Sequence, residues 1–122
     1  MKAAVELGKH VVNLGNIAKI PRGEGRVFQV GSSSIAVFHT RDGNVFATQS
    51  TCPHKGGPLA DGVVGAQKVI CPLHSFLFDL ATGEPIGNSC SRLQTYPAAL
   101  NDEREVLVGV EEMLAGTPAV GN

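Results

Sequence analysis

Cys52-Pro53-His54 and Cys71-Pro72-Leu73-His74 are the two stretches that decide how this chain is interpreted. Each short segment offers one thiolate and one imidazole, and residues 55–70 separate the two segments. Four metal ligands of two kinds therefore come from two places in the chain, as C-x-H and C-x2-H. This pattern predicts a metal centre assembled from two loops, with each loop contributing one cysteine and one histidine.

The spacings and the residues around them resemble the two cluster loops of the Rieske family. The resemblance is carried by TCPHKGGPL at residues 51–59 and ICPLHSFLFD at residues 70–79. It implies a Rieske-type [2Fe-2S] cluster in which Cys52 and Cys71 hold one iron, while His54 and His74 hold the other. Two neutral imidazoles in place of two thiolates raise the reduction potential above that of an all-cysteine cluster.

Two other interpretations of the four residues stay open. A Cys2His2 set also suits a closed tetrahedral zinc site, although zinc modules usually place cysteine with cysteine and histidine with histidine. The simplest alternative is two thiols and two histidines without a metal. The mixed Cys/His segments favour two irons with different ligand sets.

Length and charge limit what the chain can do. With 122 residues, a net charge of -1 and a pI near 6.4, we expect one domain without the basic field needed to bind nucleic acid or an anionic membrane. Residues 1–20 lack the continuous apolar stretch of a secretory signal. Cys90 remains as a single cysteine, without a partner for an intramolecular disulfide. These features predict a cytoplasmic protein whose partner is another protein.

The pattern of short β-branched and aromatic runs between turn residues predicts an all-β, antiparallel sandwich or barrel with two cluster-binding loops. We expect a domain over residues 9–110, an N-terminal segment over 1–8 and a C-terminal tail over 111–122, with one helical turn at Glu111–Ala115. Turns are expected at 41–44, at Gly83 and at 101–103. The predicted strands are 9–14, 26–30, 34–40, 45–48, 67–70, 76–79, 94–100 and 104–110.

Within the Rieske family, the sequence is most similar to the small subunit of NAD(P)H-dependent nitrite reductase. FDLATGEPIG at 78–87 and LQTYPAAL at 93–100 carry this likeness. It implies an electron-transfer subunit, rather than an independent catalyst, that serves a large subunit with flavin and sirohaem. The alternatives are a free ferredoxin that links a flavin-dependent reductase to a ring-hydroxylating oxygenase, and a metal-stabilised binding or sensor module. A redox partner is expected to dock over His54 and His74.

Other side chains refine these expectations. High-potential family members have a serine and a tyrosine where this chain has Phe76 and Phe78, so the resemblance implies a potential low in the Rieske range of about -150 to +300 mV. His39 is expected to be structural or partly exposed, and Tyr96 to be buried or half-buried. Asp79 and Glu84 are not expected to form a catalytic pair.

Overall fold

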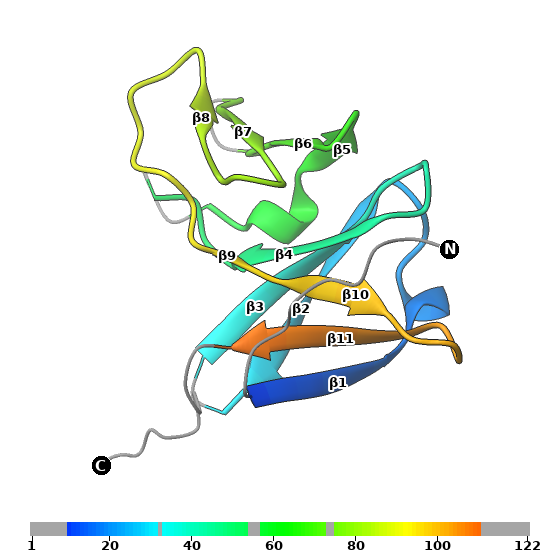
Figure 1. Ribbon diagram of the computed structural model, residues 1–122. Helices are drawn as coiled ribbons and strands as arrows, with labels where there is room; N and C mark the ends of the chain where they lie inside the picture. The colour runs from blue at the N-terminus through cyan, green and yellow to red at the C-terminus, as the bar shows by residue number, and fades with distance from the viewer. Residues whose placement is uncertain (1–9, 32, 54–56, 73–74, 111–122) are drawn as a thin grey trace.

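The protein is described by a computed structural model over residues 10–31, 33–53, 57–72 and 75–110. Its strands form three antiparallel sheets (Figure 1). In chain order the elements are β1 (His10–Asn16), η1 (Ile17–Lys19), β2 (Glu24–Val30), β3 (Ser33–His39), β4 (Val45–Gln49), η2 (Leu59–Asp61), β5 (Val63–Gly65), β6 (Lys68–Ile70), β7 (Leu77–Asp79), β8 (Pro85–Ile86), β9 (Thr95–Tyr96), β10 (Ala98–Leu100) and β11 (Glu105–Val110).

The middle sheet, in the order β2-β3-β4-β9, separates two hydrophobic cores. Strand β3 is buried on both faces, since Ile35 and Val37 enter one core while Ala36 and Phe38 enter the other. The first core lies toward the sheet β1-β11-β10 and contains Ile17, Ile20, Val30, Ile35, Val37, Val45, Ala47, Val106, Val108 and Val110. The second core lies toward the sheet β5-β6-β7-β8 and contains Ala36, Phe38, Cys52, Leu59, Val64, Val69, Cys71, Phe78, Leu80 and Leu93.

The all-β, antiparallel prediction is confirmed, and so are the three expected turns. Thr40 N–H donates to the Asn44 carbonyl at 2.9 Å, and Asn101 N–H to the Glu105 carbonyl at 3.1 Å. Gly83 has a φ of +82°, the left-handed conformation that its turn requires.

The structure differs from the sequence prediction in one divided strand and in four elements that were not predicted. The strand expected over 94–100 is divided at Pro97, which lacks the N–H needed for a continuous ladder, into β9 and β10 in different sheets. Strands β5 and β8 and both 3-10 helices were not predicted. The helical turn expected at Glu111–Ala115 lies outside the described residues.

Candidate metal centre

The two Cys/His segments lie in loops that are closed in the same way. The N–H of Cys52 donates to the carbonyl of Gly57 at 2.8 Å, and the N–H of Cys71 donates to the carbonyl of Phe76 at 2.7 Å. We call residues 52–57 the first loop and residues 71–76 the second loop. Each cysteine is therefore the first residue of a hairpin loop whose closing hydrogen bond it donates.

Backbone hydrogen bonds hold the chain on either side of both loops. The first follows β4 and is bracketed by a hydrogen bond from Leu59 N–H to the Ser50 carbonyl at 3.1 Å. The second joins β6 to β7, which pair antiparallel with Ile70 opposite Leu77. In the second loop Ser75 has a φ of +57°, a conformation that is costly for a residue with a side chain and typical of a functional site.

The two cysteines are buried in the second core, with Cys52 2% and Cys71 0% exposed. Two buried thiols on two separate loops would supply the two sulfur donors through which one iron of a Rieske-type cluster is bound. His54 and His74 lie within the same loops but outside the described residues, so the four-ligand set stays a prediction. The described donors fit the cluster, and they would also fit zinc.

Cys90, which the sequence analysis left without a disulfide partner, lies near the two loop cysteines. It is half-buried and packs against the second core, which contains both loop cysteines. Burial, and then the negative charge of Cys52, raise the pKa of the Cys90 thiol. No spacing in the sequence indicates this proximity, because Cys90 reaches the site through a separate segment after β8.

Asn88 fixes that segment beside the strand that leaves the second loop. Its side-chain amide donates to the carbonyls of Leu77 and Ile86 at 3.2 Å each, and its Oδ1 accepts from the N–H of Cys90 at 2.9 Å. One side chain therefore joins the turn after β8 to β7. The sequence analysis did not single out Asn88, because no motif or spacing there indicates this contact.

Phe76, the last residue of the second loop, and Phe78 on β7 are both in contact with the second core. Phe78 is fully buried, and Phe76 is half-buried against the same core. Neither side chain carries a hydrogen-bond donor, and this lack of donors is the reason why a low reduction potential was predicted. The potential itself stays a prediction.

His39 and Tyr96 lie on strands of the middle sheet, and their side chains project toward the first core, on the face opposite to the second core. His39 was expected to be either structural or partly exposed. It is buried, in agreement with the structural role. Because a carbonyl only accepts, Nδ1 of His39 donates to the Ile20 carbonyl, at 2.7 Å, and its Nε2 is buried without a partner among the described residues. Tyr96 is half-buried against the first core, as predicted, and burial raises its pKa.

The side chains of Asp79 and Glu84 make separate contacts. Oδ1 of Asp79 accepts from the N–H groups of Ala81 and Thr82, at 2.8 and 3.0 Å, and so shapes the turn after β7. Glu84 forms an exposed ion pair with Arg92 at 3.5 Å. The two carboxylates are therefore not paired for general acid–base chemistry.

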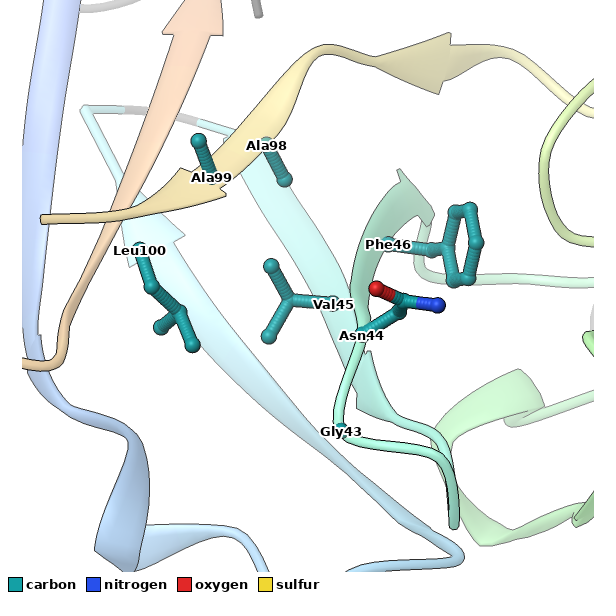
Figure 2. Close-up of a pocket in the computed structure, with 7 residues that line it drawn as sticks. All are labelled: Gly43, Asn44, Val45, Phe46, Ala98, Ala99 and Leu100. Atoms are coloured by element: carbon teal, nitrogen blue, oxygen red, sulfur yellow. The ribbon is translucent and has the colours of Figure 1, made fainter. Parts of the chain in front are cut away.

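An open hollow of about 300 Å³ lies away from the loops, between β4 and β10. Figure 2 shows its lining, in which Asn44 carries the one polar side chain among Gly43, Val45, Phe46, Ala98, Ala99 and Leu100. Such a lining supplies no titratable group for catalysis.

The described residues include no helix with the length and hydrophobicity of a membrane span.

Comparison with known proteins agrees with the geometry. The profile of the Rieske [2Fe-2S] domain matches residues 10–97. The anthranilate 1,2-dioxygenase ferredoxin subunit of Burkholderia cepacia is 35% identical over 101 residues, which cover 79% of this chain and 90% of the relative.

Two solved structures share the fold. The ferredoxin of carbazole 1,9a-dioxygenase from Nocardioides aromaticivorans IC177 has a TM-score of 0.75 and 26% identity, over 84% of this chain and 100% of that one. A Mycobacterium tuberculosis protein, named only provisionally as the small subunit of an NADH-dependent nitrite reductase, has a TM-score of 0.75 and 23% identity, over 81% and 93% of the two chains. Its identity is too low to indicate more than a common fold.

The match to the Rieske domain and to ferredoxin relatives implies a [2Fe-2S] cluster, and the two buried cysteines with their matching loops fit that cluster. The chain belongs to the Rieske [2Fe-2S] domain family and is a ferredoxin-type electron carrier.

Proposed function

We propose that Cys52, His54, Cys71 and His74 hold the cluster, and that the chain passes single electrons between two larger proteins. The bound cluster supplies one reversible redox equivalent. The observation that supports the site most directly is the pair of matching loops, each of which begins with a buried cysteine. The protein's own part is to keep both thiolates away from water and to hold the two loops at fixed anchors.

We propose the oxygenase component of an aromatic-ring dioxygenase as the electron acceptor, and a flavin-dependent reductase as the donor. The support is the 35% identity to a dioxygenase ferredoxin subunit that aligns over 90% of its length. A carrier of this kind needs no substrate pocket of its own.

The second candidate is the small subunit of an NAD(P)H-dependent nitrite reductase. Its support is the resemblance of residues 78–87 and 93–100 to that subunit. In this role the acceptor is a sirohaem large subunit that reduces nitrite to ammonia. In both roles the partner is proposed to approach His54 and His74, and the cytoplasmic location expected from the sequence stays a prediction.

Reconstitution distinguishes the two candidates. The protein with its cluster is added, with NADH and a flavin-dependent reductase, either to the oxygenase component of anthranilate 1,2-dioxygenase or to a nitrite reductase large subunit prepared without its small subunit. We expect substrate hydroxylation that depends on the added protein and is lost in Cys71→Ser. Ammonia formation with no hydroxylation would support the nitrite reductase role instead.

Cys90→Ser is the matched control for the ligand assignment. It removes a thiol that packs against the same core but is not proposed as a ligand, and we expect it to keep its iron. Loss of iron in Cys90→Ser, with iron retained in Cys71→Ser, would contradict the proposed ligand set.

A further inference from the structure

Four apolar side chains form a straight row across the sheet that carries the second loop. Val63 on β5 is paired with Ile70 on β6, Ile70 with Leu77 on β7, and Leu77 with Ile86 on β8. Residues in register on neighbouring strands project from the same face of a sheet. We call these four side chains the apolar row.

Val63 and Ile70 of the apolar row are exposed, while Leu77 and Ile86 are half-buried. The adjacent positions on the same strands, Val64, Val69 and Phe78, are buried in the second core, so the row occupies the opposite face. Val63 is 67% exposed and Ile70 37% exposed, which makes them two of the four large apolar side chains exposed in the described part of the chain.

Its position along the strands places the apolar row at the end of the sheet next to the metal centre. Ile70 directly precedes Cys71, and Leu77 directly follows Phe76, whose carbonyl closes the second loop. On the same face, one residue pair farther from the second loop, Lys68 on β6 lies opposite Asp79 on β7. The face is therefore apolar beside the cluster and charged away from it.

We infer that the apolar row is a docking surface for the oxygenase component that takes electrons from this protein, which would contact it through an apolar patch of its own. This inference rests on the proposed function. Full coverage of the row would bury a few hundred Å², well below the ~800 Å² per partner that stable complexes bury. An area of this size suits a transient electron-transfer encounter and is too small to hold two copies of the chain in a stable dimer.

The test compares two double variants with similar exposed apolar area. Val63→Ser/Ile70→Ser removes the exposed part of the apolar row, while Val11→Ser/Val27→Ser removes two valines that are 45% and 49% exposed on β1 and β2. Each protein is reduced with dithionite, desalted, and mixed in a stopped-flow instrument with the oxygenase component of anthranilate 1,2-dioxygenase or with oxidised cytochrome c. The second-order rate constant of electron transfer is recorded.

We expect the rate constant for the apolar-row variant to fall about tenfold, which corresponds to the loss of about 1.4 kcal/mol of apolar contact. We expect the control variant to stay within about twofold of the unchanged protein, since its valines lie on strands without a Cys/His loop. The paramagnetic resonance spectrum and the midpoint potential of each variant report whether its cluster is intact. Val63→Glu alone, on β5 and not on the strand that leads into Cys71, tests the same surface if the Ile70 substitution disturbs the cluster.

Each outcome has a separate meaning. Equal rate constants for the two double variants with both acceptors would overturn the docking surface. Concentration-dependent sedimentation that Val63→Glu abolishes would assign the row to a second copy of the chain and would also overturn it. If the unchanged protein reduces cytochrome c but not the oxygenase, the proposed partner is wrong and the docking surface is overturned too, whereas equal rate constants with an oxygenase that does accept electrons overturn the surface alone.

Discussion

Gly62 is expected to be the position where a single methyl group disturbs the metal centre most. It follows η2 with a φ of -76°, which any residue adopts, so alanine is excluded there by space and not by backbone conformation. A Cβ at Gly62 would lie 2.3 Å from the carbonyl oxygen of Ile70, 3.1 Å from the carbonyl oxygen of Leu59 and 3.1 Å from Cγ2 of Val69.

The size of the effect follows from the closest contact. Carbon and oxygen normally approach to about 3.3 Å, so the backbone at Ile70, one residue before Cys71, has to move by roughly 1 Å in Gly62→Ala. Overpacking of this kind costs about 1–3 kcal/mol. For a domain of this size, that cost lowers the midpoint of thermal unfolding by about 4–12 °C.

Gly65→Ala is the matched control, on the same β5–β6 hairpin. A Cβ at Gly65 meets nothing within 4 Å, so we expect its unfolding midpoint to be unchanged or slightly raised. The assay is thermal unfolding of the cluster-loaded proteins, followed by circular dichroism and by the visible absorbance of the cluster. Equal midpoints and equal iron contents in the two variants would refute the reasoning.

Three further outcomes are expected. Phe78→Tyr places a hydroxyl close to the metal centre, and one new hydrogen bond of about 1 kcal/mol would raise the midpoint potential by about 40 mV in a redox titration; no rise would count against the low-potential argument. The Asn101 amide lowers the pKa of Glu105 below its ordinary value of 4.5, so the ionised Glu105 side chain stabilises the fold fully above pH 4.5 and loses this effect as the pH falls. Asn101→Ala should return the pKa of Glu105 toward 4.5 in an NMR titration, and an unchanged pKa would contradict this. Asn88→Ala releases the segment that holds Cys90, which should then react faster with a thiol reagent; an unchanged rate would show that Asn88 does not hold it.

The sequence predicted the long strands because their alternation is local. It missed β5 because the turn between β5 and β6 uses Ala66 and Gln67, both at positive φ, in place of the glycine and asparagine that usually mark such hairpins. The carbonyl of Gln67 accepts the N–H of Leu80 at 2.9 Å, a contact between distant residues that helps to hold the unusual turn. Tertiary structure therefore overrides local preference at this hairpin.

At the site, short-range spacing identified Cys52 and Cys71, and the structure places both in the same buried core. The apolar row could not be predicted, because strand register decides which residues share a face. The proximity of Cys90 to the loops likewise depends on how the segment after β8 folds back onto β7. These features needed the tertiary structure.

The measurement that tests the central claim most directly is the electron paramagnetic resonance spectrum of anaerobically purified protein before and after dithionite, with iron and zinc quantified on the same sample. A Rieske-type [2Fe-2S] cluster predicts no signal before reduction, a rhombic signal of low average g after it, and about two irons per chain. A sample that contains zinc and gives no signal after reduction would contradict the electron-carrier function.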